Sequence, residues 1–83
     1  MKDWATLTPA MVERLHAEGG LRNSTRIRKI KSLPGDGHVD GALGRVRGSA
    51  VAAEYHTILY FVEWDDLPGV VVGITAERIE PVE

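Results

Sequence analysis

The feature that most constrains this chain is residues 58–75, which read as two apolar runs joined by a Pro-Gly turn. Both runs are rich in β-branched and aromatic residues, which suit a pleated, half-buried surface. Between them, Asp65 and Asp66 can bond to the local backbone, Pro68 presets φ, and Gly69 tolerates positive φ. The stretch predicts a hairpin against which the rest of the chain packs.

Side chains on both faces of this hairpin are apolar. In a strand, successive residues point to opposite faces. One face would carry Ile58, Tyr60, Val62 and Trp64, with Val70, Val72 and Ile74 from the second run; the opposite face would carry Leu59, Phe61 and Val71. A strand that is apolar on both faces must be covered on both. One face is expected to fill a core, and the other needs a helix or a second copy of the chain.

Length and composition indicate one globular domain spanning residues 1–83. A hydrophobic fraction of 43% argues against disorder. The sequence has no cysteine, which excludes disulfides and thiolate metal sites and favours a cytoplasmic location. No apolar run approaches the roughly 20 residues of a membrane-spanning helix, and residues 1–4 lack the apolar core of a signal peptide.

A short helix is predicted at about residues 9–18. Thr8 is placed to cap it, Pro9 suits its first position, and Gly19 can end it. Met11 and Leu15 form a narrow apolar stripe that must dock on something, because so short a helix is unstable alone. Trp4 is expected to contribute to that docking.

Five short strands are predicted in the remainder, at about 23–32, 45–51, 56–64, 70–75 and 80–83. Glycines are dense between residues 33 and 44, which predicts a long irregular loop. Residues 76–79 resemble a single helical turn. In the first strand Ile27 and Ile30 are three apart, so a bulge near Lys29 is needed to turn both inward.

This arrangement resembles the SH3-like barrel superfold over residues 23–83, with the N-terminal helix outside it. The predicted class is therefore all-β (α+β by content), a small five-stranded SH3-like barrel with one N-terminal helix. Fold class alone does not imply a function.

Within that superfold, the chain resembles the small plasmid-borne type II dihydrofolate reductase. Residues 26–29, Arg-Ile-Arg-Lys, are similar to its Arg-Val-Arg-Lys strand, and Tyr-Phe-Val-Glu at 60–63 to its Tyr-Ala-Val-Glu, which likewise precedes a Pro-Gly turn. The family is a tetramer whose central pore binds a nicotinamide cofactor and folate, and Lys29 corresponds to its pore lysine. Its pore glutamine and tyrosine are absent, because Val72 and Ile74 stand in those places. The chain is also similar in style to small cassette-encoded bacterial proteins.

Charge is unevenly distributed along the chain. Residues 22–31 contain five bases and no acid, whereas seven acids follow from Glu54 onward against one base, Arg78. The favoured interpretation is that an early basic strand pairs with late acidic strands. The alternative is a nucleic-acid surface. Its residues would be Arg26, Arg28, Lys29, Arg45 and Arg47.

Two further groups of residues are candidate sites. Asp36, His38 and Asp40 alternate in the glycine-rich loop and carry metal-ligating atoms, but their spacing matches no metal motif. The favoured interpretation is a solvated turn, because glycine and aspartate are residues that turns prefer. Tyr60 and Trp64 share one strand face, where they either pack in the core or form a binding wall. No catalytic residue, metal site or cofactor is predicted.

The function expected from the sequence is a non-enzymatic binding or assembly module that forms a homo-oligomer through an apolar strand face. Its interface residues would be Leu59, Phe61 and Val71, with Met11 and Leu15 as competing cover. The rival hypotheses are a pore-forming ligand-binding or reductase-like oligomer, or the nucleic-acid module. A small-molecule or peptide ligand would contact Lys29, Tyr60, Trp64 and Val72.

Overall fold

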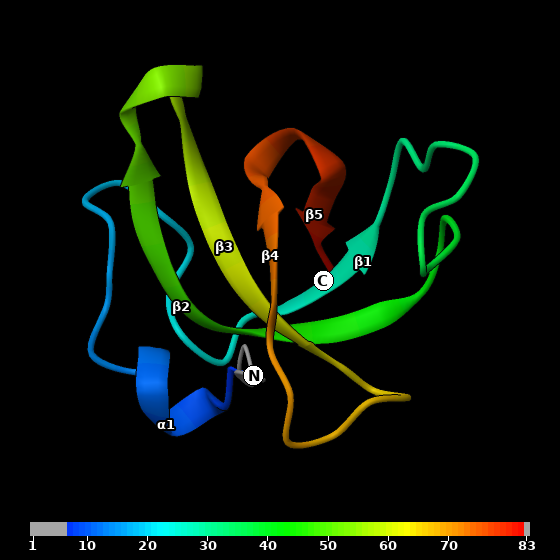
Figure 1. Cartoon of the computed structure of the whole chain (residues 1–83), viewed down its shortest axis with the longest axis horizontal. Helices are drawn as coiled ribbons and strands as arrows, with labels where there is room; N and C mark the ends of the chain where they lie inside the picture. Colours follow the sequence, from blue (N-terminus) through cyan, green and yellow to red (C-terminus); the bar gives the residue numbers. More distant parts are fainter. Residues whose placement is uncertain (1–6, 83) are drawn as a thin grey trace, which may run out of the picture.

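The computed structural model describes residues 7–82 and shows a curled, five-stranded antiparallel sheet with one short helix (Figure 1). The elements are α1 (Pro9–Val12), β1 (Arg26–Lys29), β2 (Leu43–Ala52), the 3-10 turn η1 (Ala53–Tyr55), β3 (Thr57–Trp64), β4 (Val72–Thr75), the 3-10 turn η2 (Ala76–Arg78) and β5 (Ile79–Pro81). The five strands, the long loop after the first and the single turn before the last confirm the predicted order. Trp4 lies outside the described residues.

The strand order is β4-β3-β2-β1-β5, and every neighbouring pair is antiparallel. Two long, bent strands, β2 and β3, form the middle of the sheet, and the N-terminal segment runs beside β2 (Figure 1). The sheet is open: across the described residues, β4 and β5 are its two edges and no ladder joins them.

The core lies on the concave face of this sheet. Tyr60, Val62 and Trp64 of β3 are all buried, as their alternation predicts. Ile27 and Val46, from β1 and β2, pack against them and are fully excluded from solvent. The intervening residues of β3 are half-buried, so the two faces of this strand differ as expected.

The first strand corrects one expectation. No bulge occurs at Lys29: β1 pairs regularly with β5, through Ile27 with Pro81 and Lys29 with Ile79. A regular strand places residues 27 and 29 on the same face. Lys29 is therefore buried with Ile27, at 3% exposure. The bulge lies instead in β2, between Val46 and Gly48.

The helix is also shorter than predicted. Thr8 occupies the N-cap position, but its side chain makes no capping bond, and α1 ends at Val12. Beyond it, the backbone turns to β2: Ser49 N donates to Leu15 O, and Ala17 N donates to Ser49 Oγ. These bonds satisfy groups that a longer helix would have paired internally.

Close approach of the chain at Gly48 holds the N-terminal segment against the sheet. A Cβ at this position would lie 2.3 Å from Val12 O, a distance that the backbone cannot accommodate without moving. Val12 is itself buried, at 3% exposure. Only glycine at this position allows α1 to pack directly on β2.

We therefore expect Gly48→Ala to lower the free energy of unfolding by about 2 kcal/mol, the usual cost of overpacking. The matched control is Gly37→Ala, because no atom lies within 4 Å of a Cβ at Gly37. Urea denaturation of both variants measures the difference. Equal stabilities would contradict the packing described for α1.

Candidate functional site

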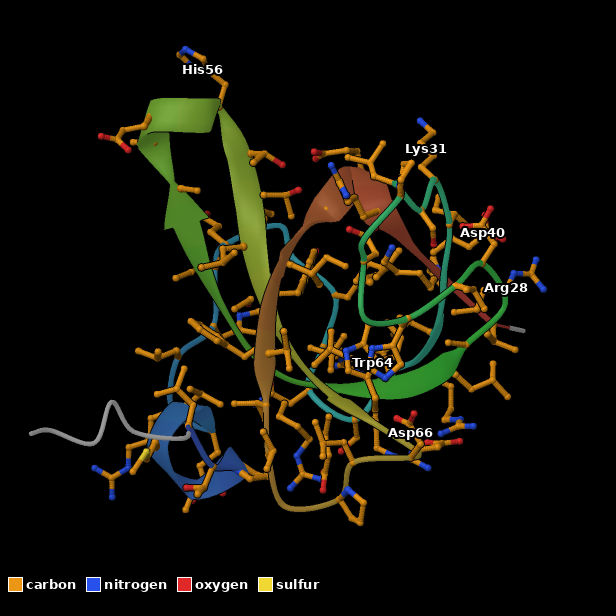
Figure 2. All side chains as sticks on the ribbon, turned by 45° about the vertical axis from the view of Figure 1, so that its right-hand side comes forward. Arg28, Lys31, Asp40, His56, Trp64 and Asp66 are labelled. Carbon is orange, nitrogen blue, oxygen red and sulfur yellow. The ribbon has the colours of Figure 1, made fainter. Side chains whose placement is uncertain are left out.

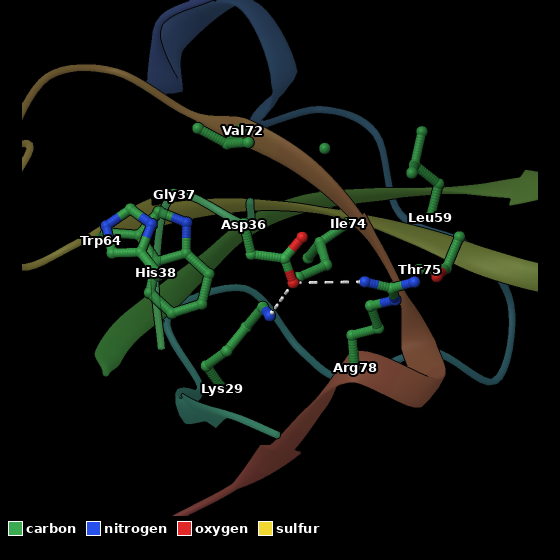
Figure 3. A pocket seen from close by; sticks show the side chains of 11 residues that line it. Lys29, Asp36, Gly37, His38, Leu59, Trp64, Val72, Ile74, Thr75 and Arg78 are labelled. Carbon is green, nitrogen blue, oxygen red and sulfur yellow. Dashed lines mark hydrogen bonds and ion pairs between the residues drawn. The ribbon is translucent and has the colours of Figure 1, made fainter. Parts of the chain in front are cut away.

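A hollow of about 360 Å³ lies between β4 and the loop that joins β1 to β2. Its walls come from segments far apart in the sequence: β1, the 36–38 loop, β3, β4 and η2. Its size is at the lower end of the range for small-molecule sites. Figure 3 shows charged side chains at its centre, with aromatic rings to one side and aliphatic groups along β4.

A buried cation forms the floor of this pocket. The Lys29 side chain is only 4% exposed, and its Nζ donates to Ser32 Oγ at 3.0 Å and to Asp36 Oδ2 at 2.9 Å. Burying an ammonium group without a counter-charge is strongly unfavourable. The Asp36 carboxylate therefore fastens the glycine-rich loop over the inward-facing end of β1.

Asp36 is held by three donors, all on one oxygen. Besides Lys29, Leu33 N donates to Oδ2 at 2.8 Å, and Arg78 Nη1 approaches it at 3.4 Å. The backbone bond from Leu33, with the Lys29 bond second, lowers the pKa of the Asp36 carboxyl. Asp36 is thus an anion between two cations.

An aromatic stack closes the pocket beside this cluster. The imidazole of His38 lies on the indole of Trp64, with ring centroids 4.6 Å apart and planes inclined by 22°. His38 Nε2 is also 2.8 Å from Asp66 Oδ1 in the β3–β4 turn. Trp64 is 1% exposed and belongs to the core, so the core itself supplies one wall of the pocket.

Three of the four predicted ligand-binding residues meet here. Lys29, Trp64 and Val72 all line the pocket. Tyr60 does not: it is buried in the core, and its hydroxyl accepts a bond from Leu21 N at 2.9 Å. The sequence interpretation missed Arg78, although its position as the lone base in an acidic half of the chain was a usable signal.

The alternating residues of the 36–40 loop do not converge. Asp36 faces Lys29, His38 faces Asp66, and Asp40 accepts a bond from Ser32 N. Figure 2 shows Asp40 at the periphery, away from Trp64. Throughout the described chain, no group of three or more metal-ligating side chains is placed to hold an ion.

Three of the four arginines named for the nucleic-acid alternative are paired with acids. Arg26 forms a two-pronged pair with Asp65, at 2.8 and 3.0 Å, Arg28 pairs with Glu80, and Arg47 lies 3.2 Å from Glu63. Arg45 donates to the carbonyl of Ser24. The predicted pairing of early bases with late acids is confirmed. Arg28 and Lys31 point away from the body (Figure 2).

The predicted interface residues fall into three groups. Leu59 and Phe61 are half-buried on the outer face of β3. Met11 and Leu15 are exposed, at 61% and 43%. Val71 is a correction: it is 3% exposed, and its N–H donates to Leu7 O, so intramolecular packing already covers it.

Comparison of the chain with protein-family models, with curated proteins and with solved structures gives no match. Among the described residues, no helix has the length and apolar character needed to cross a bilayer.

The lowered pKa of Asp36 predicts a pH dependence of stability. A carboxyl whose pKa is lower in the folded state stabilises the fold above its unfolded pKa of about 3.9, and this contribution disappears as pH falls through the folded pKa. We expect the stability difference between the wild type and Asp36→Asn to shrink as pH is lowered from about 6 to about 3. Urea denaturation at several pH values measures it. A pH-independent difference would contradict the assigned ionisation.

Proposed function

We propose that this chain is a non-enzymatic binding and assembly module that pairs with a second copy of itself, and that its fold is an SH3-like barrel left open between β4 and β5. The strand order, the long loop of residues 30–42 and the single turn η2 before β5 support the barrel assignment. The support for self-pairing lies at one edge of the sheet.

The observation that carries the proposal is that β4 is an unprotected edge strand. Natural sheets protect their edges with charged residues, proline or covering segments, because exposed main-chain groups pair readily with another strand. At the other edge, β5 carries Glu80, paired with Arg28, and Pro81. Residues 70–75 contain neither charge nor proline, and both Val72 and Gly73 are exposed.

The main chain of β4 is available for pairing. Val71 N bonds to Leu7 O just before the strand begins. In the described part of the chain, the backbone of residues 72–74 makes no bond beyond its ladder with β3. Two copies of β4 related by a two-fold axis would pair antiparallel and satisfy both edges at once.

Apolar side chains beside this edge would gain cover from the same contact. Gly73 is the register partner of Phe61, and a Cβ at Gly73 would lie 3.5 Å from Leu59 Cδ1. With glycine there, the outer-face side chains of β3 have no neighbouring β4 side chain at this position. A second copy can supply that neighbour, and such apolar surface commonly becomes an interface.

Self-pairing predicts that Val72→Lys weakens dimerisation at least tenfold. In a two-fold pair of β4 strands, each copy would place a charged lysine in the contact. The matched control is Val39→Lys, which changes a residue that is 72% exposed in the β1–β2 loop. Sedimentation velocity over a concentration series measures both. A wild-type monomer at high micromolar concentration, or equal effects of the two variants, would refute the proposal.

Small-molecule or peptide binding is a second candidate function, favoured by the pocket beside β4. The buried Lys29 ammonium, the Trp64–His38 stack and the aliphatic residues of β4 combine a charged centre with apolar walls. Pockets of this composition fix a ligand through a few polar groups and bury its apolar body.

A further inference from the structure

We propose that this pocket binds a ligand with one carboxylate and a compact apolar body. Arg78 would bind the carboxylate, whose single negative charge would balance the excess positive charge of Lys29 and Arg78 over Asp36. The inference rests on the second candidate function, ligand binding, and not on the self-pairing proposal. Its basis is an imbalance of charge and of hydrogen-bonding capacity around Asp36.

The charge imbalance follows from the pocket-lining residues. Lys29 and Arg78 are cationic, Asp36 is the one carboxylate among the residues that line the same hollow, and these three side chains together carry a net formal charge of +1. Asp36 satisfies Lys29 at 2.9 Å but is 3.4 Å from Arg78, which is longer than a normal charge-assisted bond. One more negative charge would neutralise the site, whereas a dianion would leave it negative.

The hydrogen-bonding imbalance lies on Arg78. A guanidinium group has five N–H donors. Within the described structure, Arg78 uses a single one of its side-chain nitrogens, Nη1, in the long contact with Asp36. Its side chain is 29% exposed, so it is only partly hydrated where it borders the pocket. A planar carboxylate matches the fork of this group and can be bound through two bonds.

The apolar walls define the rest of the ligand. Val72 and Ile74 lie along one side of the charged centre and the His38–Trp64 stack lies to another, as Figure 3 shows. A flat hydrocarbon body can therefore lie against aliphatic and aromatic surfaces while its carboxylate reaches Arg78. Two kinds of molecule offer a carboxylate beside an apolar group: a free aromatic or aliphatic acid, and the carboxyl end of a polypeptide with an apolar last residue.

The first test titrates the wild-type chain with 2-naphthoate and with its neutral counterpart, 2-naphthylmethanol, by heteronuclear NMR. We expect shifts at residues 36–38 and 72–78, and at least tenfold tighter binding of the acid. Acetyl-Gly-Gly-Phe with a free or an amidated carboxyl end distinguishes the polypeptide source. Equal affinities of the acid and the alcohol overturn the carboxylate inference, and no binding of any probe overturns ligand binding at this pocket as well.

The second test uses variants. Arg78→Gln is expected to weaken 2-naphthoate binding about tenfold or more without changing the affinity for the alcohol. The control is Arg28→Gln, since Arg28 pairs with Glu80 outside the pocket. Unchanged acid affinity in Arg78→Gln overturns the assignment.

Sedimentation of the same samples reports self-pairing separately. If the chain sediments as a dimer but binds none of the probes, the pocket inference is refuted and the assembly proposal stands. If the chain binds 2-naphthoate but sediments as a monomer, the assembly proposal is refuted and the pocket inference stands.

Discussion

Packing of Trp64 against Gly44 is the contact on which the rest of the structure depends. The two residues are register partners on β3 and β2, and a Cβ at Gly44 would lie 2.9 Å from the indole. Because Gly44 has no side chain, the indole of Trp64 can pack directly against β2 on the concave face. His38 stacks on this indole, and the contact holds the glycine-rich loop against the sheet.

The glycine-rich loop in turn supplies the counter-charge that the buried Lys29 requires. Regular pairing of β1 directs Lys29 inward beside Ile27, where an isolated ammonium group would be strongly destabilising. Asp36 supplies the counter-charge and is fixed by Leu33 N and Lys29 together. One ion pair thus orders the loop, closes one end of the sheet and defines the charged centre of the pocket.

The two sheet edges have different chemistry, and this difference connects the fold to the proposed function. Pro81 and the Glu80–Arg28 pair protect β5, whereas β4 offers uncharged backbone beside a pocket and half-buried apolar side chains. Arg78 stands in η2, directly between the two edge strands. Assembly through the edge of β4 and ligand binding in the pocket would therefore share residues of one strand, because Val72 and Gly73 belong to both surfaces.

The sequence by itself determined the elements whose signals are local: the alternation of Tyr60, Val62 and Trp64, the turn at Pro68 and Gly69, and the pairing of early bases with late acids. Side-chain period and turn chemistry depend on near neighbours, so they can be recognised without a fold. Tertiary structure alone decided the burial of Lys29, the early end of α1 and the meeting of Asp36 with Arg78. These depend on which segments lie opposite one another: the position of β5 keeps β1 regular, and Gly48 lets α1 approach β2. Contacts between residues 42 positions apart, such as Asp36 with Arg78, arise only when the sheet curls and brings η2 to the loop.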